Sequence, residues 1–280
     1  MSARSLLRGA ALLTAALLLS SVPLAARPDA AKEPAKGDWK LPLHTRVETF
    51  KGSGEFDEVA VTRTFNPKEC AIILCDVWDK HWCENASTRC GELAKKMVPV
   101  LAAARKRGVL VIHAPSECMD FYKDAPQRKA MKEIPPVLPP KARDLPDPPL
   151  PVDASDGGCD DDTQREQCRA WTREHPAIPI ADEDFISDNG AEVYNLLKQR
   201  GVRTLFVMGV HTNMCVLNRS FAIKQMTKWG VQCVLVRDLT DAMYSPKSKP
   251  FVSHEEGTER IIQHIEKHWC PTVLSADLKK

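Results

Sequence analysis

The chain has 280 residues, of which 43% are hydrophobic and 27% are charged, with 13 glycines and 21 prolines. These fractions exclude a collagen, a coiled coil and a fully disordered chain, and the length is sufficient for one large core or two modest ones. The 39 Lys and Arg against 37 Asp and Glu give a net charge of +2, and so balanced a chain offers no electrostatic case for nucleic acid or an anionic membrane as its main partner.

The first 26 residues have the pattern of an export signal. Arg4 and Arg8 precede an apolar run at 9–19, and small residues follow at 20–26. The run is shorter than the roughly 18 apolar residues that a spanning helix needs, so we expect residues 1–26 to be a cleaved signal peptide. An uncleaved N-terminal anchor is the alternative. The predicted product is exported, to the periplasm or the extracellular space, and leaves the membrane after cleavage.

An extension precedes the main domain. Residues 27–38 are polar and contain Pro and Lys, and residues 39–64 alternate loosely in polarity around Gly52-Ser53-Gly54. This pattern predicts two extended segments joined by a turn. We therefore assign residues 27–66 to an N-terminal extension and residues 67–280 to the main domain.

The main domain alternates between two kinds of apolar pattern. Continuous apolar runs, typical of strands buried on both faces, occur at 70–75, 109–113, 204–208, 231–236 and 271–274. Helical spacing occupies the intervals at 85–108, 193–201, 214–229 and 253–269, and Pro99 predicts a kink or a division in the first of these. Alternating strands and helices indicate an α/β fold with a parallel sheet covered on both faces.

A long insert, residues 114–179, interrupts this alternation. It holds 12 of the 21 prolines and an acidic run at 160–162, so it cannot be a central strand and is expected to run over the surface. It leaves the sheet directly after His113, at the carboxyl end of a strand, where α/β proteins bind ligands. We therefore predict a lid, with a disordered insert, an oligomer contact or a surface elaboration as alternatives. The candidate substrate contacts are His113, Glu117, Phe121 and Tyr122, which lie at or near its first root.

Two reactive side chains follow predicted strands. Asp76 comes directly after the first core strand, and Cys215 follows the turn at 209–213 and begins a helix. A helix N-terminus stabilises a thiolate, and a partly desolvated carboxylate is suited to proton transfer. Alone, Asp76 could be a turn residue and Cys215 a buried apolar residue. Placed across one crevice, the two indicate a nucleophile and its acid/base.

The segments that carry these residues resemble the isochorismatase-like cysteine hydrolases, the family of nicotinamidases and N-carbamoylsarcosine amidases. The resemblance lies in Ala-Ile-Ile-Leu-Cys-Asp at 71–76, in Val-Met-Gly-Val-His-Thr-Asn-Met-Cys-Val-Leu at 207–217 and in residues 230–242. It covers roughly residues 68–114 and 180–275.

The resemblance implies a three-layer α/β/α sandwich with a mostly parallel, Rossmann-like sheet. It also implies Cys215 as nucleophile, Asp76 as acid/base, and a cis peptide near Val210-His211 that shapes an oxyanion hole. Family members that have this cysteine mostly hydrolyse amides such as nicotinamide, carbamoyl or ureido groups. We therefore expect a small-molecule substrate whose C–N bond is cleaved through a thioester.

One position departs from the family pattern. The family's third catalytic residue is a Lys, and the matching position falls near Asp182 within Ala-Asp-Glu-Asp-Phe. A carboxylate cannot supply the positive charge of an ammonium group. Either a cation comes from elsewhere, with Lys80 and Lys123 as candidates, or the chemistry differs, or activity is lost. The alternative function is therefore a non-catalytic ligand-binding or interaction module on the same fold.

No cofactor is predicted, although a divalent metal has two candidate ligands, Asp79 and His81. Some amidases of the family hold a metal with an Asp and two His, but the spacing of Asp79, His81 and His113 does not match that motif. The acidic run at 160–162 lacks the pattern of a calcium loop. A homo-oligomer is compatible with the sequence.

Ten cysteines fit an oxidising compartment, in which some of them pair. Two sequence-local disulfides are expected, Cys83–Cys90 and Cys159–Cys168. If Cys215 is a thiol, an odd number remains, so at least one more cysteine is free. Cys75, in a buried strand, is the expected one.

Overall fold

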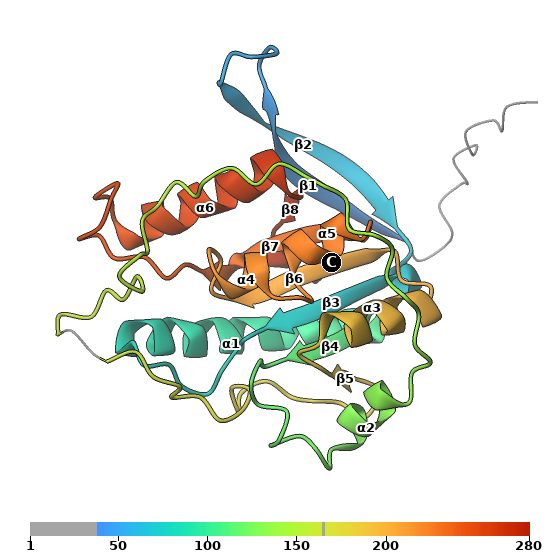
Figure 1. Ribbon diagram of the computed structural model, residues 1–280. Helices are drawn as coiled ribbons and strands as arrows, with labels where there is room; N and C mark the ends of the chain where they lie inside the picture. Colours follow the sequence, from blue (N-terminus) through green and yellow to red (C-terminus); the bar gives the residue numbers. More distant parts are fainter. Residues whose placement is uncertain (1–37, 164–165) are drawn as a thin grey trace, which may run out of the picture. The chain divides into compact units, whose positions relative to one another are not determined.

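The described residues form an eight-stranded sheet with the strand order β2-β1-β8-β7-β6-β3-β4-β5 (Figure 1). The computed structural model describes residues 38–163 and 166–280, so the predicted signal peptide lies outside it. Six neighbouring strands are parallel: β3 (Cys70–Cys75), β4 (Leu110–Ala114), β5 (Phe185–Ile186), β6 (Thr204–Val210), β7 (Gln232–Asp241) and β8 (Thr272–Val273).

Helices cover both faces of this sheet because successive strand residues point to opposite sides. Ile72 and Leu74 of β3 pack in one hydrophobic cluster and Ile73 in the other. The first cluster includes α1 (Glu84–Lys106) and α7 (Ser275–Leu278). The second includes α3 (Gly190–Gln199), α4 (Cys215–Asn218), α5 (Ile223–Lys228) and α6 (His254–His268). The predicted three-layer α/β/α sandwich with a mostly parallel sheet is confirmed.

The two extended segments expected before the core are a hairpin that extends the sheet. β1 (Trp39–Glu48) pairs antiparallel with β2 (Phe56–Phe65) along its full length. β1 also contacts β8, with His44 opposite Thr272. The hairpin therefore belongs to the same sheet as the main domain, with β2 at its edge.

The structure decides between the alternatives for one helix and corrects another. Helix α1 is a single helix that contains Pro99, so the division into two consecutive helices is not found. Pro99 and Lys95, whose carbonyl loses its helical partner, are both exposed, so water can satisfy that carbonyl. The helix expected at 214–229 is divided into α4 and α5, because Arg219 adopts an extended conformation.

The insert forms α2 (Pro126–Lys132) and then a long irregular segment, which we call the strap (residues 133–179). From α2 the strap runs along the layer that holds α3 and α5 and returns to the carboxyl end of the sheet (Figure 1). The backbone N–H of Val137 donates to Asn195 of α3, and that of Arg143 donates to the carbonyl of Lys228 in α5. Val152 and Ile178 are buried in the core clusters. The described part of the strap is thus packed onto the fold.

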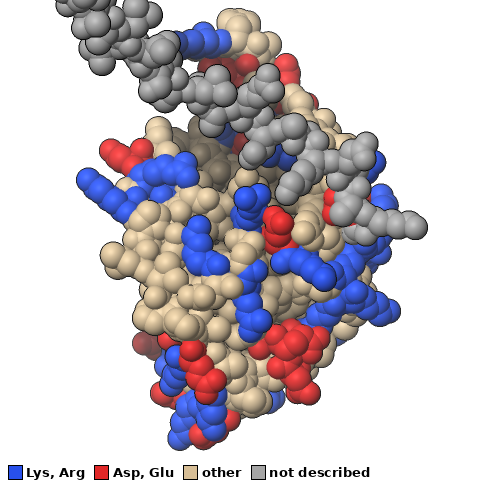
Figure 2. Space-filling model, turned by 90° about the vertical axis from the view of Figure 1, so that its right-hand side faces the viewer, with Lys and Arg blue, Asp and Glu red and all other residues tan. Residues whose placement is uncertain are grey.

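The surface carries charges of both signs. Lys and Arg side chains gather near the middle of the face in Figure 2, and Asp and Glu side chains lie on the same face. Within residues 38–163 and 166–280, no helix combines the length and apolar character that crossing a membrane requires.

Candidate active site

Two adjacent strands bring Asp76 and Cys215 together. Cys75, the last residue of β3, pairs with Gly209 of β6, so the segments that follow both strands emerge side by side. Gly209 has a φ of 125°, and a Cβ at this position would lie 2.0 Å from the carbonyl oxygen of Cys75. Glycine therefore permits the close approach of the two strands where the site begins. The Cys215 thiol and the Asp76 carboxyl lie close enough for each to shift the pKa of the other.

Asp76 is fully buried and held by two donors. The backbone N–H of Ser116 lies 2.7 Å from its Oδ1, and Nε of Arg219 lies 2.8 Å from its Oδ2. Burial raises the pKa of the Asp76 carboxyl, and the charge of Arg219 and the hydrogen bonds only partly oppose that rise. Asp76 also has a φ of 50°, in the left-handed region that is costly for most side chains. The carboxylate is therefore fixed in direction and has a raised proton affinity.

Cys215 is the first residue of α4 and faces the carboxylate. Burial raises the pKa of its thiol, the charge of Asp76 raises it further, and Arg219 opposes this rise. The backbone N–H of His211 also faces the Cys215 sulfur and lowers its pKa. The peptide bond between Val210 and His211 is cis, at the position that the resemblance implies. These shifts favour a protonated Cys215 thiol beside the Asp76 carboxyl.

Arg219 is the cation of the site, and the sequence analysis did not identify it. Lys80 and Lys123, the two candidates from the sequence, are both exposed, whereas Arg219 bonds directly to Asp76. Nη2 of Arg219 also lies 3.6 Å from Oε1 of Glu117, and its guanidinium lies 5.9 Å from the ring centre of Trp78. No local pattern points to Arg219, because it follows α4 in an extended conformation and its contact with Asp76 joins residues 143 positions apart.

The insert residues predicted to contact substrate have three different environments. Glu117 is exposed and contacts Arg219, which places it at the site. Phe121 is 56% exposed, and its ring packs edge-on against Tyr122. Tyr122 is buried, and its hydroxyl oxygen accepts a hydrogen bond from the backbone N–H of Glu174. Tyr122 therefore holds the strap.

His113, a predicted substrate contact, is engaged by two carboxylates of the protein itself. Its imidazole is fully buried, with Nδ1 2.7 Å from Glu174 of the strap and Nε2 3.0 Å from Asp184. Asp184 is also bound by Arg105 of α1. Both ring nitrogens are thus occupied, and His113 fastens the end of the strap to the sheet.

Aromatic rings line the side of the site next to Arg219. The indoles of Trp78 and Trp171 stack with ring centres 4.1 Å apart, and His81 stacks on Trp171 at 5.7 Å. Trp171 belongs to the strap, so the strap supplies one layer of this stack. The ring of His211 meets His81 edge-on at 4.9 Å, and its Nε2 is buried without a partner among the described residues.

The two candidate metal ligands serve other contacts. Asp79 accepts hydrogen bonds from the backbone N–H and the hydroxyl of Thr172 in the strap. Nδ1 of His81 accepts a hydrogen bond from the backbone N–H of Cys83. Asp79 and His81 therefore fasten the strap and the turn that follows β3.

The predicted disulfides were wrong. Cys83 pairs with Cys159 of the strap, 76 residues away, while Cys90 is buried and free and Cys168 is exposed and free. Cys83 and Cys90 lie two helical turns apart, about 10 Å along α1, and a disulfide requires Cα atoms within about 7 Å. Cys75 is free and buried, as expected.

Acidic residues next to Cys159 bind the start of α1. Asp160 accepts two hydrogen bonds from Arg89, at 2.8 and 3.1 Å. Asp161 accepts hydrogen bonds from the backbone N–H groups of Glu84 and Asn85, each at 2.9 Å. Helix α1 has no capping side chain of its own, so the strap satisfies the first donors of this helix.

Comparisons with known proteins find similarity in structure only. No family model matches the chain, and no curated protein matches it in sequence. A cysteine hydrolase from Pseudomonas syringae pv. phaseolicola 1448A superposes with a TM-score of 0.48 at 16% identity, covering 77% of this chain and 92% of that one. An isochorismatase from Pseudomonas putida KT2440 gives 0.44 at 13% identity, over 75% and 90% of the two chains. An isochorismatase family protein from Burkholderia thailandensis gives 0.43 at 15%, over 77% and 95%. These names are those of the family that the sequence resembles.

Proposed function

We propose that this chain is an exported cysteine hydrolase that cleaves the C–N bond of a small-molecule amide through a thioester on Cys215. The observation that carries the proposal is the cluster of Cys215, Asp76 and Arg219 at the carboxyl ends of β3 and β6, in which Arg219 bonds to Asp76 at 2.8 Å and Asp76 acts on the pKa of the Cys215 thiol. This cluster provides a nucleophile, a proton acceptor and a cation. The sequence resemblance to amide-cleaving cysteine hydrolases supports the same reaction class.

In the proposed reaction, Sγ of Cys215 attacks the carbonyl carbon of the amide while its proton passes to Asp76. The tetrahedral oxyanion is held by the backbone N–H groups of His211 and Cys215, at the start of α4. The C–N bond then breaks, and Asp76 returns the proton to the leaving nitrogen, which departs as ammonia or an amine. Asp76 next takes a proton from water as the water attacks the thioester, and the acid leaves as the thiol is restored.

Arg219 provides the charge that the family obtains from a lysine. Burial alone would keep Asp76 protonated, and a protonated Asp76 cannot accept the thiol proton. The guanidinium at 2.8 Å favours the carboxylate form and offsets the negative charge that develops on sulfur. Because it acts through Asp76, Arg219 is assigned as a positioning residue.

The test is an ammonia-release assay over nicotinamide, N-carbamoyl and ureido compounds, with wild type, Cys215→Ala and Asp76→Asn. Wild type should release ammonia from at least one compound, and both variants should lose that activity. Equal turnover by Cys215→Ala and wild type would overturn the nucleophile assignment.

Arg219 is tested by its pH profile. In Arg219→Met, loss of the cation should raise the pKa of Asp76, so that the acidic limb of kcat/KM moves to higher pH, and Arg219→Lys should restore part of the shift. The matched controls are Lys80→Met and Lys123→Met, which remove exposed cations and should leave the profile unchanged. An unshifted profile in Arg219→Met would contradict the role given to Arg219.

A non-catalytic ligand-binding module is the second candidate, and the raised pKa of Cys215 favours it, because a protonated thiol is a poor nucleophile. The rate of alkylation at Cys215, measured as a function of pH with and without amides, distinguishes the hydrolase from the binding module. A hydrolase should show ammonia release and faster alkylation when Arg219 is present than in Arg219→Met. A binding module should bind amides without releasing ammonia.

Export is part of the proposal. The signal-like pattern at 1–26 supports it, as does the disulfide between Cys83 and Cys159, since structural disulfides persist in oxidising compartments. Mass analysis of the protein secreted by an expressing bacterium should show an N-terminus close to Arg27. Retention in the cytoplasm with Met1 intact would contradict this part.

A further inference from the structure

Strand β2 has a free edge among the described residues. It stands at the end of the strand order and is bonded on one side, to β1 (Figure 1). Its ten residues are exposed apart from half-buried Phe56 and buried Phe65. Val59 and Val61 are 37% and 46% exposed. A ten-residue edge with exposed valines and no proline is a template for pairing with another strand.

The hairpin fixes which residues of β2 can bond to a partner strand. The backbone N–H of Thr49 donates to the carbonyl of Glu55 at the turn, so odd-numbered residues of β2 direct their backbone groups toward β1. The backbone groups of Glu58, Ala60 and Thr62 therefore point to the free edge. In an antiparallel pair, these even-numbered residues must bond to even-numbered residues of the partner.

One register among these makes β2 complementary to itself. When Ala60 of one copy faces Ala60 of the other, Val59 faces Val61 and Asp57 faces Arg63, on both sides of a two-fold axis. A shift of two residues would place Asp57 opposite Val61 or Phe65. Opposite charges and β-branched pairs across strands are favourable, whereas a charge against an apolar side chain is not.

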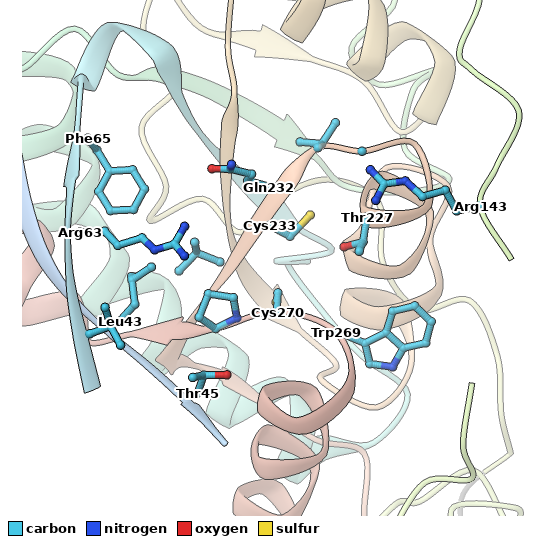
Figure 3. Close-up of a pocket in the computed structure, with 15 residues that line it drawn as sticks. Leu43, Thr45, Arg63, Phe65, Arg143, Thr227, Gln232, Cys233, Trp269 and Cys270 are labelled. Atoms are coloured by element: carbon cyan, nitrogen blue, oxygen red, sulfur yellow. The ribbon is translucent and has the colours of Figure 1, made fainter. Parts of the chain in front are cut away.

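The cavity beside β2 has an excess of positive charge, and this register offsets part of it. It has a volume of about 520 Å³ and lies between the hairpin and α5 (Figure 3). Its 15 lining residues include Arg63 and Arg143 and no Asp or Glu. Arg63 extends from β2 into the cavity. Residues opposite one another in a sheet point to the same face, so Asp57 of the second copy lies next to Arg63 at the cavity.

We propose that two copies of this chain associate through β2, antiparallel and with Ala60 facing Ala60, so that their sheets become one continuous sheet. The occupant is a second copy because the charges and valines of β2 match those of β2 itself under a two-fold rotation. This closed, symmetric contact also covers the exposed edge.

The first test is oxidative crosslinking of Ala60→Cys, with Thr62→Cys as the matched control. In the proposed register the Cα atoms at position 60 are about 5.5 Å apart, within reach of a disulfide. Those at position 62 are about 14 Å apart, because they are offset by four residues along the strands as well as by the distance between the strands. Ala60→Cys should form a dimer linked between peptides that carry position 60, and Thr62→Cys should not. Crosslinking at 62 in preference to 60 would overturn the register.

The second test is charge exchange, followed by light scattering over a concentration series. Arg63→Asp places like charges opposite one another twice in the dimer and should raise the dissociation constant about tenfold. Asp57→Arg combined with Arg63→Asp restores both pairs and should recover wild-type dimerisation. A wild-type monomer at all concentrations overturns the proposal. A monomer whose backbone N–H groups at Glu58, Ala60 and Thr62 exchange slowly would also overturn the proposal. In that case residues near the N-terminus of the same chain would be the group that pairs with the edge of β2.

Discussion

His113 is expected to make this protein less stable at alkaline pH than at neutral pH. Burial acts to lower the pKa of its imidazole, but the carboxylates of Glu174 and Asp184 outweigh burial and raise that pKa from 6.5 to about 9. The distances of 2.7 and 3.0 Å to the two carboxylates explain the size of the effect. The charged imidazole therefore joins the strap to the sheet.

The sign of the effect follows from the two pKa values. The folded-state pKa lies above the unfolded value, so the stabilisation is fully present below about pH 6.5 and is lost as the pH rises through about 9. A rise from 6.5 to about 9 corresponds to about 3 kcal/mol in the free energy of unfolding.

Urea unfolding of wild type and of His113→Asn combined with Glu174→Gln measures this contribution. The double variant replaces the buried ion pair by two neutral amides, and because Asn is smaller than His the comparison uses the change in stability with pH rather than the absolute stability. Between about pH 6 and about pH 10, wild type should lose about 3 kcal/mol more than the double variant. A nuclear magnetic resonance titration of His113 should give a midpoint well above 6.5. Parallel stability profiles for the two proteins would refute the reasoning.

Three further changes test the fastening of the strap and the close approach of β3 and β6 at Gly209. Cys83→Ser with Cys159→Ser opens a loop spanning 76 residues and should lower the free energy of unfolding by up to about 4 kcal/mol in urea; no change would contradict the pairing. Asp161→Ala removes the acceptor for the first N–H groups of α1 and should cost about 1 kcal/mol in thermal unfolding. Gly209→Ala forces a Cβ to 2.0 Å from a backbone oxygen and should prevent soluble expression, whereas Gly201→Ala, with open space around it, should cost only about 1 kcal/mol.

The sheet could be predicted because its strands are uninterrupted apolar runs. Cys70–Cys75 and Thr204–Val210 are buried along their whole lengths, so composition alone indicates them. β5 has only two residues, Phe185 and Ile186, too few for a pattern. The division between α4 and α5 was also missed, because local spacing there is helical. The contact between Arg219 and Asp76 lies across the fold, and local propensity carries no signal for it.

The residues of the candidate site likewise divide into those that the sequence predicts and those that it does not. Asp76 and Cys215 could be inferred because each follows a strand, and parallel strands end at one edge of the sheet. Cys159, the partner of Cys83, and Glu174, a partner of His113, could not be inferred, since both lie in the strap, whose path is set by tertiary contacts. Local spacing favoured Cys90 as the partner of Cys83, but helix geometry holds those two sulfurs apart.

The charged groups of the site and the strap beside them come from different parts of the chain. Asp76 follows β3, and Cys215 and Arg219 belong to the segment after β6, so the reactive cluster depends on two neighbouring core strands. The strap adds Trp171 to the wall beside Arg219 and is fastened by a disulfide, by Asp79 and by the ion pairs of His113. The two contributions therefore rest on different contacts: β3 and β6 position the thiol, the carboxylate and the guanidinium, and the strap adds a wall that its own disulfide and ion pairs hold in place.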